Sequence, residues 1–224
     1  MNAKYQNYLR CYKEHIRDAF EGFFRTWDRD ALLRAIDLYN MDKYEEAIKI
    51  LDRLRKKCKT VNEHCVVLTF TALCYDDLHY FASAVDCYRE ILELDPERSE
   101  IRSNLGLLYR RMGEYEKAIS CFNDALVSDP NNPYALNNLA LTHYRMGEYE
   151  AAIRNAERAL GIKGNLYQAA NCLALSHLVR GNKVAAKKYY QLAIHNGGDP
   201  KVIEREIQKL REGHIIGNDD FWDL

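Results

Sequence analysis

The sequence predicts an all-α fold, a right-handed α-solenoid of about five helix-turn-helix repeats with a capping helix at each end. Three observations lead to this prediction. The hexapeptide Arg-Met-Gly-Glu-Tyr-Glu occurs at 111–116 and again at 145–150, an offset of 34 residues. Alanines recur at the same spacing, and the four prolines interrupt none of the periodic runs. Self-similarity with a period of a few tens of residues indicates stacked units, each of which buries its apolar face on its neighbours.

Two columns of small residues set the register of the helix pairs. The second helices carry Ala47, Ala84, Ala118, Ala152 and Ala186. The first helices carry Ala35, Ala72, Gly106, Ala140 and Ala174. Small side chains let two helices approach closely, and larger ones would overpack their crossing. The spacing is 34 residues after the second pair but 37 before it, so three extra residues are expected in the first junction, near 62–64.

A turn residue follows the first helix of every pair. These residues are Asp42, His79, Gly113, Gly147 and Gly181. Glycine is favoured where the backbone adopts a positive φ to close a helix, so we expect that conformation here. Asp95-Pro96 and Asp129-Pro130 end two of the pairs, because proline cannot continue a helix interior.

Together these columns resemble the tetratricopeptide repeat family. The resemblance covers residues 28–199 as five units, of which the third and fourth follow the family pattern most closely. It implies that the first helices of successive pairs line a concave groove. In this family a peptide segment or a helix of a partner protein usually lies in that groove.

The segments on both sides of the repeats have the pattern of caps. Residues 200–213 follow the N-cap Asp199, begin with proline and carry apolar residues at i, i+4 and i+7, which predicts a capping helix. Residues 1–27 predict an amphipathic helix whose apolar face is mostly Tyr and Phe. This N-terminal helix is expected to be a cap, with a dimerisation helix as the alternative.

The C-terminal tail, 214–224, carries Phe221, Trp222 and Leu224 after the capping helix. Large apolar side chains on a free end are unusual. Three interpretations compete: packing over the cap, a short linear motif for another protein, and docking into the chain's own groove. Self-association through the N-terminal helix or this tail therefore stays open.

Composition limits the kinds of partner. The 32 Lys and Arg residues nearly balance the 33 Asp and Glu residues, so no global field favours nucleic acid or an anionic membrane surface. No run approaches the roughly 20 apolar residues of a membrane-spanning helix. Seven cysteines, an odd number spread over helical positions, indicate reduced thiols in a cytoplasmic protein.

The sequence contains no recognisable catalytic or metal site. Cys58, His64 and Cys65 are the tightest cluster of metal-ligating residues, but they lack the paired C-x-x-C spacing of structural zinc sites. The chain has no G-x-S-x-G, no H-E-x-x-H and no Gly-rich phosphate loop. His143 and His177 stand in a column that elsewhere holds tyrosine, which favours a packing role. We therefore expect no enzyme activity, no cofactor and no bound metal.

Helical geometry selects the candidate groove residues, which lie on the first helices and point away from the small-residue seam. They are Leu73, Asn104, Leu107, Arg111, Tyr134, Asn137, Asn138, Leu141, Arg145, Asn171 and Leu175. The leucines repeat every 34 residues and would provide apolar anchors. An asparagine amide both donates and accepts, so a row of them can hold an extended peptide backbone. The same amides can also tie neighbouring helices together.

The expected function is a non-catalytic scaffold or adaptor that binds a peptide segment or helix of another protein in the concave groove. The alternative is a regulatory sensor, in which a small peptide or metabolite changes the curvature of the solenoid and so exposes the N-terminal aromatic helix. Weak coupling between neighbouring units would make the curvature easy to change.

Chaperone-binding members of the family grip a C-terminal carboxylate with a clamp of basic residues and asparagine. This chain has Leu32, Ile36 and Thr69 where the basic residues of that clamp are required. Recognition of an acidic C-terminal tail in that manner is therefore disfavoured. Arg110, Arg111 and Arg145 could supply a different anion contact.

Overall fold

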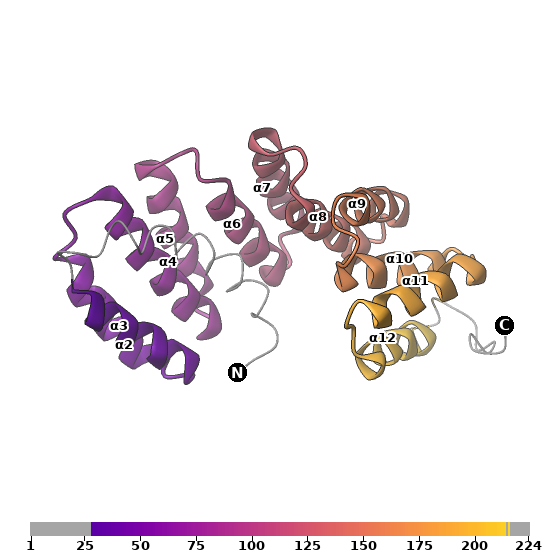
Figure 1. Ribbon diagram of the computed structural model, residues 1–224, viewed down its shortest axis with the longest axis horizontal. Coiled ribbons are helices and arrows are strands. Elements are labelled where there is room, and N and C mark those ends of the chain that lie inside the picture. Colours follow the sequence, from indigo (N-terminus) through magenta and orange to yellow (C-terminus); the bar gives the residue numbers. More distant parts are fainter. Residues whose placement is uncertain (1–27, 214, 216–224) are drawn as a thin grey trace. The chain divides into compact units, whose positions relative to one another are not determined.

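The computed structural model describes residues 28–213 and 215 of the chain (Figure 1). Within these residues the backbone forms helices joined by short turns and contains no strand. None of the described helices combines the length and the apolar character that a bilayer crossing requires. The chain divides into two compact units, Met1–Pro96 and Glu97–Leu224, and each is described by itself.

The described part of the first unit consists of two helix pairs. α2 (Arg29–Asn40) packs on α3 (Tyr44–Arg55), and α4 (Val61–Asp77) packs on α5 (Phe81–Leu94). α3 also contacts α4, which joins the two pairs. Their shared core contains Leu32, Leu51, Phe70 and Leu73.

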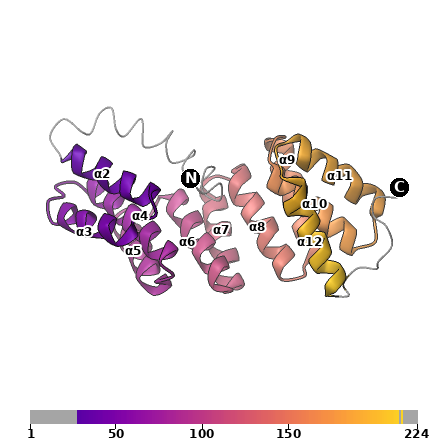
Figure 2. The same cartoon turned by 90° about the horizontal axis from the view of Figure 1, so that it is seen from below.

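The described part of the second unit consists of three further pairs and a last helix (Figure 2). The pairs are α6 (Ser99–Met112) with α7 (Tyr115–Ser128), α8 (Pro133–Arg145) with α9 (Tyr149–Ile162), and α10 (Tyr167–Val179) with α11 (Lys183–His195). The last helix, α12 (Pro200–Glu212), contacts α10. Its apolar residues Ile203, Ile207 and Leu210 are buried in one cluster with Leu178 of α10.

The small-residue columns are confirmed as the places where paired helices meet. The five alanines of the second helices are 0% exposed, and Ala72 and Ala140 of the first helices are 0% exposed as well. At Gly106 an added Cβ would lie 2.7 Å from Cε1 of Phe122, which is too close for two carbon atoms. The crossing of α6 and α7 therefore depends on the absence of a side chain at this position.

The predicted positive φ is present at every turn position. The φ angles are 59° at Asp42, 63° at His79, 79° at Gly113 and Gly147, and 77° at Gly181. For residues other than glycine this conformation costs about 1–2 kcal/mol. Local contacts accompany it: Asp42 accepts a hydrogen bond from the Tyr44 hydroxyl at 2.6 Å, and the ring of His79 packs edge-on against Phe81.

The three extra residues of the first junction lie inside a helix rather than in a loop. Thr60 Oγ1 accepts a hydrogen bond from the backbone N–H of Glu63, and the Glu63 carboxylate accepts one from the N–H of Thr60, both at 3.2 Å. This capping box begins α4 ahead of residues 62–64. The insertion therefore lengthens α4 to 17 residues and leaves the connection to α3 short.

Candidate peptide-binding groove

Four of the candidate residues share one face of α8. Tyr134, Asn138, Leu141 and Arg145 are spaced i, i+4, i+7 and i+11, which places them on the same side of a helix. The first three are partly exposed and Arg145 is exposed. Because α8 contacts both α6 and α10, the first helices of the three pairs are neighbours within the second unit. α8 is therefore the centre of the candidate surface.

Local interactions fix both the start of α8 and its outward face. Asn132 Oδ1 accepts hydrogen bonds from the backbone N–H groups of Tyr134 and Ala135, each at 3.0 Å, and Pro133 occupies the first turn. The Tyr134 hydroxyl accepts a hydrogen bond from the ammonium group of Lys163, which also lies 4.6 Å from the centre of the tyrosine ring. The Tyr134 ring is thus held in place by the residue that ends α9, the second helix of the same pair.

The candidates on α6 and α10 differ in their accessibility. On α6, Leu107 and Arg111 are partly exposed, whereas Asn104 is buried. On α10, Asn171 is partly exposed and Leu175 is buried. A partner could therefore reach Leu107, Arg111 and Asn171 without any rearrangement of the helices.

The predicted strip of leucines is only partly available. Leu73 is 3% exposed and belongs to the core of the first unit, and Leu175 is 4% exposed and packs in the cluster around α12. In the second unit, Leu107 and Leu141 keep part of their surface accessible. An apolar anchor within this unit would therefore rest on Leu107 and Leu141.

Three of the predicted asparagines carry an amide atom that lacks a hydrogen-bond partner. These atoms are Nδ2 of Asn104 on α6, Oδ1 of Asn137 on α8 and Oδ1 of Asn171 on α10. All three atoms are buried, and a buried polar atom without a partner costs about 1–3 kcal/mol. Such atoms are rare in folded proteins and call for an explanation, and a ligand that completes the hydrogen bonding is one. The three asparagine amides therefore retain unused hydrogen-bonding capacity on the neighbouring helices α6, α8 and α10.

Arg110 is a residue that the sequence-derived set of groove positions omits. It lies three residues after Leu107 on the same side of α6, and its Nη1 is buried without a hydrogen-bond partner. Burial, and after it the positive charge of Arg145, lower the pKa of Arg110 to about 10. The i+3 spacing from Leu107 is the sequence signal that points to this position.

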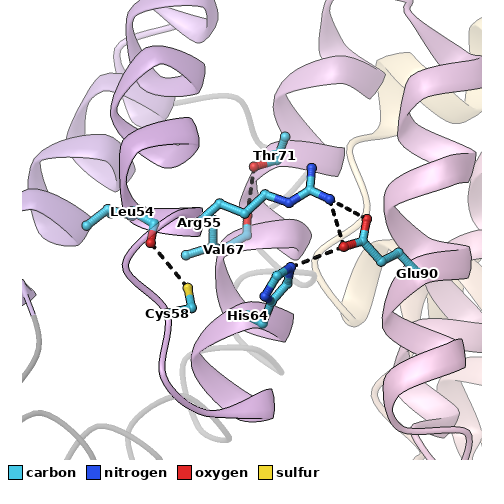
Figure 3. A network of polar contacts seen from close by, with 7 residues as sticks. All are labelled: Leu54, Arg55, Cys58, His64, Val67, Thr71 and Glu90. Carbon is cyan, nitrogen blue, oxygen red and sulfur yellow. Dashed lines mark hydrogen bonds and ion pairs between the residues drawn. The ribbon is translucent and has the colours of Figure 1, made fainter.

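In the first unit a network of polar side chains joins the two helix pairs (Figure 3). Arg55 Nη2, at the end of α3, donates to both carboxylate oxygens of Glu90 on α5, at 2.7 and 2.6 Å. His64 Nε2 on α4 lies 3.1 Å from Glu90 Oε1. Because these groups use their hydrogen-bonding capacity on one another, we interpret the network as a structural link between the helix pairs and not as a binding site.

Burial keeps four cysteines of the described chain in the protonated thiol form. Cys58 Sγ donates to the backbone carbonyl of Leu54 at 3.3 Å (Figure 3). Burial raises the pKa of Cys58 and Cys87 to about 11 and that of Cys74 and Cys172 to about 12. Over residues 28–213 and 215, no three His, Cys, Asp or Glu side chains are grouped so that they could hold a metal ion.

Some expectations concern segments outside the described residues. These are the amphipathic helix over 1–27, the packing of Phe221, Trp222 and Leu224, and self-association through either segment. The sensor hypothesis depends on the same N-terminal segment.

Comparisons with known families match almost the whole described chain. Profiles described as tetratricopeptide repeat match residues 97–165 and 137–200. A profile described as the N-terminal TPR repeats region of Psidin matches residues 26–117. No curated protein is a significant match to the chain.

Solved structures resemble the chain in fold. A tetratricopeptide repeat protein from Parabacteroides merdae aligns with a TM-score of 0.68 and 19% identity, over 81% of this chain and 71% of that one. PilF of Pseudomonas aeruginosa aligns with a TM-score of 0.67 and 17% identity, over 83% of this chain and 92% of that one. MamA aligns with a TM-score of 0.62 and 20% identity, over 78% of this chain and 96% of that one. The 34-residue period, the stacked helix pairs and these matches agree, and the chain belongs to the tetratricopeptide repeat family.

Proposed function

We propose that the chain is a cytoplasmic scaffold or adaptor that binds an extended peptide segment of a partner protein along α6, α8 and α10. The tetratricopeptide repeat fold in general supports non-catalytic protein–protein interaction. The proposal adds a place on this chain and a mode of recognition, namely bonding of the partner's backbone by asparagine amides.

The three unpartnered amide atoms carry the proposal. A peptide backbone offers alternating N–H donors and carbonyl acceptors. It could therefore bond Nδ2 of Asn104 through a carbonyl, and Oδ1 of Asn137 or Asn171 through an N–H group. Small rotations of the amides toward the groove would bring these atoms within reach of the ligand. Each new bond would remove a cost that the unliganded protein carries.

Leu107 and Leu141 support the proposal because they lie beside these amides on α6 and α8 and keep accessible surface. Burying the apolar surface of a ligand against them would contribute about 25 cal/mol per Å². Hydrogen bonds from the amides to the peptide backbone would not depend on the sequence of the peptide. Leu107 and Leu141 would favour peptides with apolar side chains at the positions that face them.

The test is the double substitution Asn138→Ala with Leu141→Ala at the centre of the surface. Both side chains are partly exposed, so their removal should leave the helical circular dichroism spectrum unchanged. Proteins retained from native extract by immobilised chain should be lost with the double variant. Capture that survives these two substitutions would falsify the groove assignment.

The matched control removes an asparagine and a branched aliphatic residue of equal size from the second helix of the same pair. Asn155 and Ile162 lie on α9, where Asn155 donates to the carbonyl of Ala151 and Ile162 is 45% exposed. The double variant Asn155→Ala with Ile162→Ala should retain the captured proteins. Equal loss in both double variants would indicate non-specific adsorption rather than a groove.

A further inference from the structure

Two arginines of the second unit lie at the ends of neighbouring first helices without an acidic partner. Arg110 is in the last turn of α6, and Arg145 is the last residue of α8. In the described part of the chain neither guanidinium forms an ion pair or a hydrogen bond with a carboxylate. Since α6 and α8 are the first helices of consecutive pairs, they run in the same direction and their C-terminal ends meet at the same edge of the unit.

Of the two arginines, Arg110 gives the stronger evidence for an anion-binding site. Its Nη1 is buried and has no hydrogen-bond partner, yet the residue as a whole is only partly covered, so part of its surface stays open to solvent. The helix C-terminus favours a cation in general, but no backbone carbonyl accepts a hydrogen bond from this Nη1. The guanidinium of Arg110 thus has one desolvated nitrogen that no hydrogen bond compensates.

The electrostatic surroundings of Arg110 are positive. Burial lowers its pKa to about 10, and the next cause is the charge of Arg145. The two groups that act in the opposite direction are Cys172 and Tyr115, a thiol and a phenol. Burial raises the pKa of the Cys172 thiol to about 12, so at neutral pH this thiol is uncharged. Arg110 nevertheless remains protonated at neutral pH, and an incoming anion would meet two cations.

A guanidinium presents its donors in a planar fork that matches the two oxygens of a carboxylate. We propose that Arg110 and Arg145 form a carboxylate-binding site at one end of the groove, and that the partner segment is acidic. The peptide would place an Asp or Glu side chain on the two arginines while its backbone bonds Asn104 and Asn137. This inference rests on the proposed function and adds the charge of the partner to it.

The experiment measures binding of labelled octapeptides to the full chain by fluorescence anisotropy. The acidic probe is Gly-Asp-Glu-Leu-Asp-Glu-Leu-Asp, with its C-terminus amidated so that only side-chain carboxylates are present. The neutral probe replaces every acidic residue with its amide, as Gly-Asn-Gln-Leu-Asn-Gln-Leu-Asn. Inorganic phosphate is the competitor that distinguishes a site for any small anion from a site for an acidic peptide.

The expected results depend on charge at the two arginines. The chain should bind the acidic probe at least about tenfold more tightly than the neutral probe, and added salt should weaken this binding. Arg110→Met should reduce affinity for the acidic probe by about tenfold or more, and Arg145→Gln by several-fold. Arg154→Gln removes an equal charge from the exposed side of α9 and should leave the affinity unchanged.

A second measurement separates a binding role of Arg110 from a structural one. Replacing an uncompensated buried cation with an apolar side chain of similar length should preserve or raise the melting temperature. The acidic probe should raise the melting temperature of the wild-type chain and fail to do so for Arg110→Met. A marked fall in the melting temperature of unliganded Arg110→Met would mean that Arg110 supports the fold, and would overturn the proposal.

Three other outcomes would also overturn it. Equal binding of the acidic and neutral probes would reject the anion site and leave the peptide groove standing. Displacement of the acidic probe by phosphate at equal ionic strength would assign the arginines to small anions. No binding of either probe to the wild-type chain would reject the acidic-partner proposal. In that case the Asn138 and Leu141 double variant in extract would decide separately whether a groove exists.

Discussion

Gly106 has no side chain because the ring of Phe122 occupies the space that a Cβ would need. The same requirement for small residues recurs at every first-helix seam, where Ala72 and Ala140 are fully buried. At the turns, by contrast, glycine serves the backbone: Gly113 and Gly147 adopt a positive φ, and a Cβ there would meet no atom within 4 Å. A glycine in this repeat therefore serves either close approach or backbone conformation, depending on its position.

Gly106→Ala should destabilise the chain. The added methyl would press on the ring of Phe122, which is fully buried and has little room to shift. We expect a loss of about 1–3 kcal/mol in the free energy of unfolding, the usual range for overpacking. Urea denaturation followed by circular dichroism measures this loss.

Gly161→Ala on α9 is the matched control. An added Cβ there meets nothing within 4 Å, and the backbone does not adopt a positive φ. Alanine should therefore stabilise the helix by about 0.4–1 kcal/mol, because it restricts the unfolded chain. If both substitutions had the same sign, close approach would not be the reason for Gly106.

Elements in this fold are joined by polar as well as apolar contacts. The carboxylate of Glu90 on α5 receives Arg55 from α3 and His64 from α4, so one side chain connects three helices (Figure 3). These side chains are 30–42% exposed, and ion pairs at this exposure contribute little because water competes for both partners. The apolar seams, rather than this network, account for most of the cohesion between the two pairs.

Glu90→Gln should therefore have a modest effect. An amide keeps one acceptor for Arg55 but loses the charge and the second equivalent oxygen. We expect a loss of up to about 1 kcal/mol in the free energy of unfolding at low salt, and a smaller loss at high salt. Glu93→Gln, on an exposed position of the same helix, should change stability by less than about 0.5 kcal/mol. A loss well above 2 kcal/mol for Glu90→Gln would show that the network behaves as a buried one.

At the scale of the whole molecule, buried groups that must stay neutral occur in both units. In the first unit burial raises the pKa of Cys74 to about 12 and that of Cys87 to about 11, and in the second it raises the pKa of Cys172 to about 12. Burial also raises the pKa of Tyr144 and of Tyr190. Each of these groups holds its proton more tightly in the folded chain than in the unfolded chain.

Stability should consequently fall as pH rises above about 9. The ordinary thiol pKa is 9.0, so unfolded cysteines lose their protons above about pH 9 while the folded ones keep theirs until about pH 11–12. The contribution of these groups to stability is therefore complete below pH 9 and is lost as pH rises through this window. Urea midpoints at about pH 7.5 and about pH 10.5 should differ, with the lower midpoint at the higher pH.

A Cys172→Ala variant is the control for this pH dependence. Its midpoint should fall less steeply with pH than that of the wild-type chain, whatever its stability at neutral pH. A midpoint that rises between the two pH values would contradict the assignment of these thiols as buried and neutral.

The sequence predicts those features of the fold that the local backbone conformation requires, and it predicts less well where inserted residues are placed. The positive φ at His79 is predictable from its place in the column of turn residues, because closing the helix requires this φ of whichever residue occupies the position. The lengthening of α4 was not predicted, since the spacing of alanines shows that three residues are inserted but not where they go. The capping box of Thr60 and Glu63 decided it, and its S/T-x-x-E pattern is readable in the sequence.

The candidate site likewise has features that the sequence predicts and features that depend on neighbouring helices. The position of Asn138 and Leu141 on an accessible helix face follows from helical periodicity alone. The burial of Leu73 and Leu175 does not, because it depends on which neighbouring helix covers each one. For Arg110 the sequence indicates only a general anion contact, and the missing hydrogen-bond partner of its Nη1 follows from the packing of the surrounding helices.

The sequence by itself determined the repeat period, the order of the helix pairs, the seam residues and the turns. Each of these depends on contacts within one repeat or between adjacent repeats of similar sequence. Only the tertiary structure decided which groove residues are covered, which amide atoms lack partners and that Nη1 of Arg110 is desolvated. These properties depend on side chains brought together from α6, α8 and α10. The identity of a residue within one repeat does not specify how much of its side chain the adjacent repeats cover.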